Sequence, residues 1–229
     1  MSNPTRIHTS LLARVEKRAL IWMAERLPPW VSSDRLTLLA LLAMAGAGAA
    51  FAAARWSPPA LFLVIAALAV NWFGDSLDGT LARVRRQERP RYGFYVDHVL
   101  DIVGTSFLLI GLSASGLMSA TLAFGVLVAY LLVAAEVFLA TTVRGEFRMS
   151  FFGMGPTELR IVLAVGALRA FINPYVDWGA LGTFRLFDVG GVAAIVGLGV
   201  ALIVSAVRNT RALYLAEPLE STLLESKPM

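Results

Sequence analysis

Long apolar segments, separated by short polar ones, make up most of the chain. They run over residues 36–54, 60 to beyond 78, 93–112, 120–143, 157–172 and 187–207. A helix needs about 20 mostly apolar residues to cross the hydrocarbon core of a bilayer. The pattern therefore predicts an all-α, polytopic membrane protein with six transmembrane helices.

A charged segment precedes the first apolar run, and its pattern differs. Between residues 10 and 27, one side of a helix would carry Leu12, Val15, Ala19, Met23 and Leu27, and the other side Arg14, Lys17, Arg18 and Glu25. Ser10 is a suitable N-cap, and Pro28-Pro29 would end the helix. The segment is too charged to span, so we expect an amphipathic helix at the membrane interface. The alternative is a helix whose apolar side packs on the rest of the protein.

Local signals refine the expected helices. Ser33 or Asp34 is a suitable N-cap for the first span. Small residues allow helices to approach closely. They form one expected packing face at residues 45–50 and another at Gly190, Gly191, Gly197 and Gly199.

Composition agrees with a membrane protein. Hydrophobic residues make up 57% of the 229 positions and charged residues only 16%, against about 25% charged in soluble domains. The absence of cysteine excludes disulfides, thiolate metal sites and cysteine nucleophiles. The net charge of +4 comes from basic residues in short connecting segments. This distribution indicates membrane topology and not a nucleic-acid partner.

The basic residues also predict the orientation. Five arginines lie between positions 83 and 91, and the leader, the segment near Arg148 and the tail are basic too. By the positive-inside rule, both termini and the arginine-rich loop at 83–91 face the cytoplasm, in an inner or plasma membrane. We divide the chain into an N-terminal cytoplasmic segment (1–35), a six-helix transmembrane domain (36–210) and a cytoplasmic tail (211–229).

Four carboxylates lie at the ends of two adjoining apolar segments. Asp75 and Asp78 precede the arginine-rich loop, and Asp97 and Asp101 follow it. Residues three or four apart share a helix face, so each pair is on one face, and the two faces can meet. A carboxylate near a membrane costs several kcal/mol unless it is paired or metal-bound. Hard divalent cations such as Mg²⁺ prefer oxygen ligands, so the spacing predicts a metal site.

Small and basic residues accompany the carboxylates. Gly79, Ala82 and Gly93 leave room for a ligand or a neighbouring helix, and Arg83 offers a planar fork suited to phosphate. The residues therefore predict a metal-bridged diphosphate site at the membrane surface.

The complete pattern is D-x2-D-G-x2-A-R, nine residues, then G-x3-D-x3-D, from Asp75 to Asp101. It resembles the signature of the CDP-alcohol phosphotransferases, also called CDP-alcohol phosphatidyltransferases. The resemblance implies a transferase of phospholipid biosynthesis that moves a phosphoalcohol group from a CDP-alcohol to an acceptor hydroxyl and releases CMP. It also implies a homodimer that uses two Mg²⁺ or Mn²⁺ ions.

The resemblance assigns roles to the signature residues. Asp75, Asp78 and Asp97 would bind the metal ions, and Asp101 would be the general base, although it could also complete a metal sphere. The nucleotide site would be shaped by Gly79, Ala82, Arg83 and Gly93. Thr37 is a further candidate neighbour of the cytidine, with a bond to its own helix as the alternative.

Residues outside the signature lead to further expectations. Arg148, Glu158 and Arg160 lie on the motif's side of the membrane, and we expect them to form an acceptor pocket. Glu158 could equally serve the helix dipole. Glu136, inside a span, would face the polar site or pair with a basic residue.

A polar acceptor favours CDP-diacylglycerol as donor. The alternatives are a small CDP-alcohol donor, of the CDP-choline or CDP-ethanolamine type, with a diacylglycerol acceptor, or a divalent-cation transporter.

Overall fold

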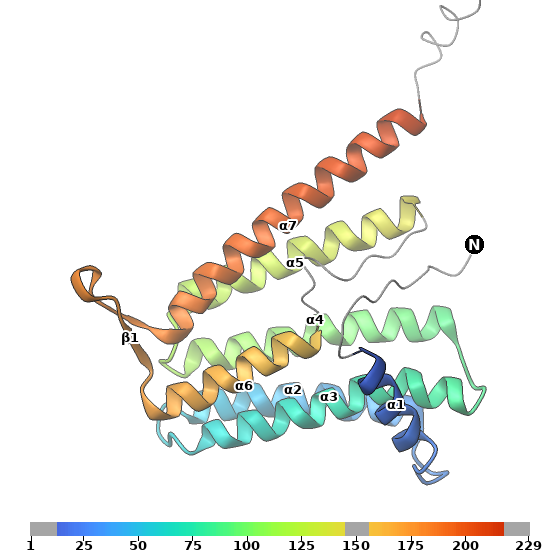
Figure 1. Ribbon diagram of the computed structural model, residues 1–229, viewed down its shortest axis with the longest axis horizontal. Coiled ribbons are helices and arrows are strands. Elements are labelled where there is room, and N and C mark those ends of the chain that lie inside the picture. Colours follow the sequence, from blue (N-terminus) through green and yellow to red (C-terminus); the bar gives the residue numbers. More distant parts are fainter. Residues whose placement is uncertain (1–12, 145–155, 218–229) are drawn as a thin grey trace, which may run out of the picture.

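The computed structural model describes residues 13–144 and 156–217, and helices dominate this part of the chain (Figure 1). Within these residues lie seven α-helices and one two-stranded sheet. The elements are α1 (Ala13–Ala24), α2 (Ser33–Ala53), α3 (Ala60–Val84), α4 (Pro90–Ala114), α5 (Ala120–Arg144), α6 (Pro156–Ile172), β1 (Tyr175–Asp177), β2 (Thr183–Arg185) and α7 (Leu186–Ala216).

Among the described residues, five helices are long and apolar enough to cross a membrane, namely α2, α3, α4, α5 and α7. The chain is therefore an integral membrane protein. The remaining expected span corresponds to α6, which has 17 residues and a length of about 26 Å at 1.5 Å per residue. The hydrocarbon core is about 30 Å thick, so the count of six spans stays a prediction.

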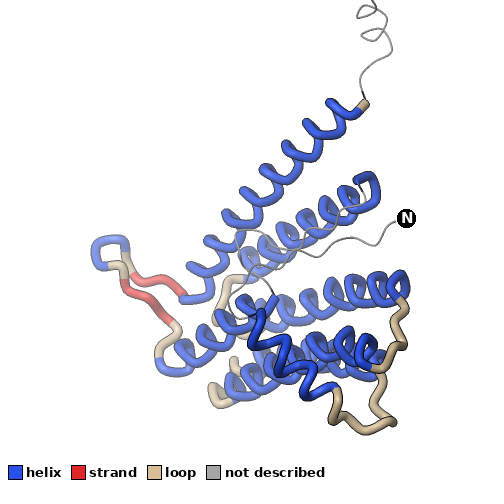
Figure 2. Tube along the Cα trace, turned by 45° about the vertical axis from the view of Figure 1, so that its right-hand side comes forward, coloured by secondary structure: helices blue, strands red, loops and turns tan. Residues whose placement is uncertain are grey.

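The spanning helices form two groups (Figures 1 and 2). α2 packs extensively on α3 and α4, and α6 lies against α3. α5 and α7 form a pair that meets the first group mainly through α4. α3 is thus a direct neighbour of α6 and shares the neighbour α2 with α4. All three of α3, α4 and α6 carry predicted site residues.

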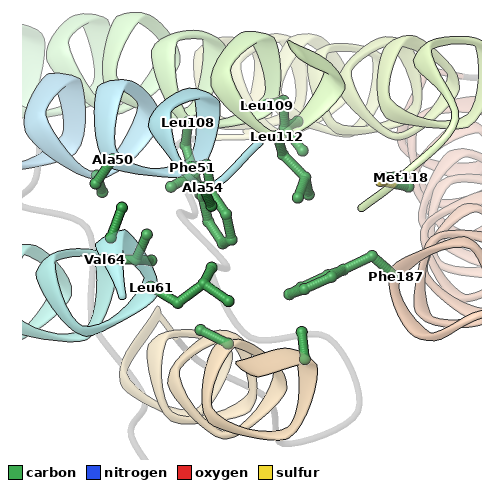
Figure 3. Packing of buried hydrophobic residues seen from close by; sticks show 14 of the residues in the cluster. Ala50, Phe51, Ala54, Leu61, Val64, Leu108, Leu109, Leu112, Met118 and Phe187 are labelled. Atoms are coloured by element: carbon green, nitrogen blue, oxygen red, sulfur yellow. The ribbon is translucent and has the colours of Figure 1, made fainter. Parts of the chain in front are cut away.

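The main apolar core lies at the end of the bundle where α2 ends and α3 begins. Phe51, Leu61, Leu112 and Phe187 converge there from four helices (Figure 3). The rings of Phe51 and Phe187 meet edge to face, with centroids 5.6 Å apart. The predicted carboxylates lie at the opposite ends of α3 and α4, so the core fixes these helices without occupying the site.

Glycines allow the closest helix crossings. A Cβ placed on Gly111 would lie 1.9 Å from the carbonyl oxygen of Gly48, so only glycine fits at this crossing of α4 with α2. Gly48 confirms part of the small-residue face at 45–50, whereas Gly46 has open space beside it. On α7 only Gly191 is closely packed; Gly190, Gly197 and Gly199 have open space where a side chain would be.

The buried face of α1 agrees with the predicted one only in part. Met23 and Leu27 pack against a cluster formed by Leu20 and Ala24 with the α3 residues Leu77 and Leu81, as the apolar spacing predicts. The predicted Ala19 is instead exposed, while Leu20 and Ala24, which the prediction left out, are buried. The side chain of Arg85, at the end of α3, donates to the carbonyl oxygens of Val31, Leu27 and Pro28. Contacts with α3 therefore determine which face of α1 is buried. The predicted N-cap, Ser10, lies outside the described residues.

Two local expectations were wrong, and one element was not predicted. The N-cap of α2 is Ser32, whose side chain accepts a hydrogen bond from the backbone N–H of Arg35, while Ser33 and Asp34 lie in the first turn. The segment after Asn173 forms a hairpin that the hydropathy pattern did not indicate, with Tyr175 opposite Arg185, so the described fold is not purely helical. α7 continues to Ala216, because its polar end is rich in good helix formers.

Candidate metal and phosphate site

Three of the four predicted carboxylates meet between α3 and α4. Asp75, Asp97 and Asp101 each offer one carboxylate oxygen, and these oxygens lie within 4.8 Å of one another. Asp97 and Asp101 share a face because they are four residues apart on α4. All three side chains are half-buried. Such a set of oxygen ligands suits a hard divalent cation.

Asp78 lies beside this cluster and has partners of its own. Its Oδ2 accepts a hydrogen bond from the hydroxyl of Thr37 at 2.7 Å, and its Oδ1 accepts one from the backbone N–H of Gly79 at 2.5 Å. The charges of Asp75 and Asp97 are close enough to repel that of Asp78. The expectation that all four carboxylates converge is thus met by three, whose oxygens lie within 4.8 Å of one another, while Asp78 lies beside them.

Thr37 reaches the motif from the second turn of α2. Its Oγ1 lies 3.0 Å from the carbonyl oxygen of Ser33 and 2.7 Å from Oδ2 of Asp78. A hydroxyl has one proton to donate, and the charged acceptor forms the stronger bond. Thr37 therefore orients a carboxylate of the motif, a role that the sequence reading did not foresee.

Arg160 brings a positive charge from α6 to the cluster. Its Nη2 donates to Oδ2 of Asp75 at 2.5 Å, and its Nε donates to Oδ1 of Asn71 at 2.6 Å. It also lies close enough to Asp101 to attract that carboxylate electrostatically. Arg160 therefore contacts one predicted metal ligand, Asp75, directly.

The small signature residues leave space at the site. A Cβ on Gly93 would meet nothing within 4 Å, and one on Gly79 would meet only the Arg83 guanidinium, at 3.5 Å. Arg83 is exposed and donates to the hydroxyl of Thr80 at 3.0 Å, and Ala82 is half-buried. This open surface beside the carboxylates can admit a phosphate-bearing ligand.

Two residues near the cluster were missed by the sequence analysis. Asn71 precedes Asp75 by one helical turn, and this spacing could have revealed it, since 71, 75, 78 and 82 form one helix stripe. Tyr130, on α5, is hydrogen-bonded with Thr105 and lies near Asp101 and Asp97. Nothing in the local sequence around Tyr130 signals this position.

Of the three other predicted residues, the structure describes Glu158 and Glu136. Arg148 lies outside the described residues, and Glu158 is half-buried in the first turn of α6. Glu136 accepts hydrogen bonds from Ser205 at 2.8 Å and from Asn209 at 2.7 Å, both on α7. It therefore joins α5 to α7, while the nearby Arg144 donates to Asn209.

The fold and the site together define an integral membrane protein with a carboxylate cluster, flanked by arginine, at one end of its helices. The model of the CDP-alcohol phosphatidyltransferase family matches residues 30–210, and the chain belongs to this family. The resemblance inferred from the Asp75–Asp101 signature is thereby confirmed. No curated protein matches the chain significantly.

Proposed function

We propose that the protein transfers a phosphatidyl group from a CDP-alcohol to an acceptor hydroxyl and releases CMP. The observation that carries this proposal is the cluster of Asp75, Asp97 and Asp101 on two adjoining helices. Membership of the family supports phosphoalcohol transfer in phospholipid synthesis. The open surface at Gly79 and Gly93 offers room for the donor next to the carboxylates.

Mg²⁺, or Mn²⁺ in its place, fits the donor set, because every ligand offered is a carboxylate oxygen. We assign two ions to Asp75, Asp78, Asp97 and Asp101. Although both oxygens of Asp78 accept hydrogen bonds, each keeps a further lone pair for a metal. When bound, the ions would neutralise the charge that develops on the phosphates.

In the proposed reaction, the acceptor hydroxyl oxygen forms a bond to the β-phosphorus, which bears the alcohol. The bond from that phosphorus to the oxygen bridging the two phosphates breaks, and CMP leaves with this oxygen. Asp101 takes the proton of the hydroxyl, for which it must come within hydrogen-bond distance. In the alternative role, Asp101 is a metal ligand and another group accepts the proton.

The two substrates would approach from different sides of the cluster. Gly79, Ala82, Arg83 and Gly93 would line the nucleotide side. Thr37 would act there through Asp78. The acceptor would lie toward α6, where Arg160 is joined in the proposal by Arg148 and Glu158. Positive charge on this side favours a polar or anionic acceptor, and hence CDP-diacylglycerol as donor. The alternative, with a small CDP-alcohol donor, places diacylglycerol there.

We further propose that the catalytic unit spans residues 36–210, that it works as a homodimer, and that its site faces the cytoplasm. The family match to residues 30–210 supports the first point. The arginines between positions 83 and 91 support the orientation, because they follow directly after the α3 end of the cluster.

The test is CMP release by purified protein in detergent with Mg²⁺. CDP-diacylglycerol is offered with serine, glycerol phosphate, inositol, inositol phosphate or choline, and CDP-choline or CDP-ethanolamine with diacylglycerol. We expect release that requires one acceptor and is lost in Asp97→Asn. Asp177→Asn, in the hairpin at the far end of α6, is the matched control and should keep full activity. Metal flux through liposomes without CMP release for any pair would contradict the proposal.

A further inference from the structure

A buried asparagine outside the signature holds Arg160 in place. Asn71 is 5% exposed, and its Oδ1 accepts the 2.6 Å hydrogen bond from Nε of Arg160. Its Nδ2 donates to the carbonyl oxygen of Ala40 on α2 at 3.0 Å. Both ends of the amide are therefore engaged, which fixes its orientation. One chain of hydrogen bonds thus links α2, α3 and α6.

The other edge of the same guanidinium faces the acidic cluster. Nη2 of Arg160 lies 2.5 Å from Oδ2 of Asp75, and the two side chains are 13% and 21% exposed. Charges so poorly exposed to water interact more strongly than charges on an open surface. Because Asn71 restrains Arg160, this positive charge is a permanent part of the cluster.

We infer that Arg160, oriented by Asn71, is a built-in counter-ion of the acidic cluster and lowers its affinity for divalent cations. The inference rests on the proposed function, because it takes the cluster to be the metal site. Two effects act in the same direction. The guanidinium repels an incoming cation, and it occupies one oxygen of Asp75, a proposed metal ligand. Asn71 is then a positioning residue that acts through Arg160.

The counter-ion has a second consequence, for the protein without metal. Three carboxylates within 4.8 Å repel one another, and Arg160 offsets part of this repulsion. Loss of Arg160 should therefore destabilise the metal-free protein while it strengthens metal binding. A purely structural residue would not produce these two opposite changes.

The experiment measures Mg²⁺ binding by isothermal titration calorimetry, and the thermal midpoint with and without Mg²⁺, for the full chain in detergent. Arg160→Gln should bind Mg²⁺ at least about tenfold more tightly, since a unit charge is removed from a half-buried site. Its midpoint should be lower without Mg²⁺ and should rise more on Mg²⁺ addition. Asn71→Ala should shift the affinity in the same direction by less. Arg169→Gln, with the same charge change at the other end of α6, should match the wild type.

The possible outcomes distinguish a failure of the counter-ion inference from a failure of the proposed function. If the wild type binds Mg²⁺ and Arg160→Gln binds it equally or more weakly, the counter-ion inference is overturned and the proposed function stands. If the wild type binds neither Mg²⁺ nor Mn²⁺, both the counter-ion inference and the proposed function are overturned. Because binding is measured directly, a loss of catalytic activity in Arg160→Gln cannot obscure the result.

A second, independent observation concerns the hairpin between α6 and α7. Cross-strand partners share a face, and faces alternate along a strand. Val176 pairs with Phe184, and the ring centroids of Trp178 and Phe184 lie 5.6 Å apart. Asp177 pairs with Thr183, and Tyr175 with Arg185, on the opposite face. The hairpin therefore has one apolar face and one face that is polar apart from the ring of Tyr175.

The apolar face is open and continues the surface of the spanning helices. Trp178 is 51% exposed, Phe184 is 41% exposed and Leu181, at the tip, is 73% exposed. Ile172, the last residue of α6, is 75% exposed just before the hairpin. The hairpin projects from the end of α6 opposite to Arg160, where α7 begins (Figure 1). Aromatic residues are enriched where spans reach the headgroups of a bilayer.

We propose that this hairpin lies in the headgroup region of the leaflet opposite the acidic cluster, with its apolar face toward the acyl chains. Its partner is thus a phospholipid surface. The polar face, with Asp177 and Thr183, would point toward water. Continuity with the exposed apolar end of α6, at Ile172, is the reason to choose lipid over a second protein chain.

Because the chain has no cysteine, single cysteines can report on the two faces. Leu181→Cys and Asp177→Cys are each labelled with an environment-sensitive fluorophore and reconstituted in liposomes of phosphatidylcholine and phosphatidylglycerol. The label at position 181 should be several-fold less quenched by iodide than the label at 177, and should be quenched by lipids brominated on their acyl chains. Equal iodide quenching at both positions overturns the proposal. Protection at position 181 that disappears as the protein is diluted in excess lipid also overturns it, since it identifies a second copy as the partner.

Discussion

The hydroxyl of Thr37 on α2 donates a 2.7 Å hydrogen bond to Oδ2 of Asp78 on α3. Ser33, one turn earlier on α2, donates to the backbone carbonyl oxygen of Asp78 at 3.0 Å. The start of α2 thus holds both the backbone and the side chain of one signature residue. The first span is in this way part of the site, although the signature itself begins only at Asp75.

Removal of the Thr37 hydroxyl should impair the reaction more than the fold. We expect Thr37→Val to lower the turnover number by about 10- to 150-fold, because a hydrogen bond to a charged group is worth roughly 1.5–3 kcal/mol. Thr37→Ser, which keeps the hydroxyl, should retain most of the activity. Steady-state CMP release at saturating donor measures both variants. If Val and Ser variants have equal rates, the bond to Asp78 does not matter for turnover.

Asp101→Asn distinguishes the two roles left open for Asp101. As a general base, its loss should reduce turnover by about 100-fold or more while Mg²⁺ affinity stays near that of the wild type. As a metal ligand, its loss should weaken Mg²⁺ binding as well. Calorimetric titration with Mg²⁺ alongside CMP release separates these cases. An unchanged rate would remove both assignments.

The class of fold and the centre of the site could be predicted from the sequence alone, because both depend on patterns within short stretches of the chain. A run of about 20 apolar residues has few alternatives to a span, and spacings of three and four bring Asp75, Asp97 and Asp101 onto facing helix surfaces. The partners of these residues depend on tertiary packing. Arg160 is 85 positions from Asp75, and Thr37 is 41 from Asp78. No local pattern indicates which helices become neighbours.

The errors have the same origin. α1 has several apolar residues on more than one side, so the contacts with Leu77 and Leu81 select the face that is buried. The hairpin after Asn173 has strands of three residues, too short for a clear alternation of apolar and polar positions. Of the four glycines expected to pack on α7, only Gly191 has a close neighbour, the terminal methyl group of Met118.

The crossing of α2 and α4 should tolerate no side chain at Gly111. In Gly111→Ala the new Cβ would lie 1.9 Å from the Gly48 carbonyl oxygen, so the helices must separate. We expect a loss of about 1–3 kcal/mol in the free energy of unfolding, as for other overpacked cores. Thermal unfolding in detergent measures it. Gly46→Ala, two residues from Gly48 with open space beside it, is the control and should be neutral or slightly stabilising. Equal stability of the two variants would refute the close approach.

The pairing of α5 with α7 should depend on Glu136. This carboxylate accepts hydrogen bonds from Ser205 and Asn209, so Glu136→Leu would leave two polar groups on α7 without this partner. We expect a loss of roughly 1 kcal/mol, in the range measured for polar contacts between membrane helices, and little change in Glu136→Gln, which can still bond to both. Thr142→Leu, exposed on the same helix, controls for added apolar surface. If Glu136→Leu unfolds at the wild-type temperature, these hydrogen bonds do not hold α7 to α5.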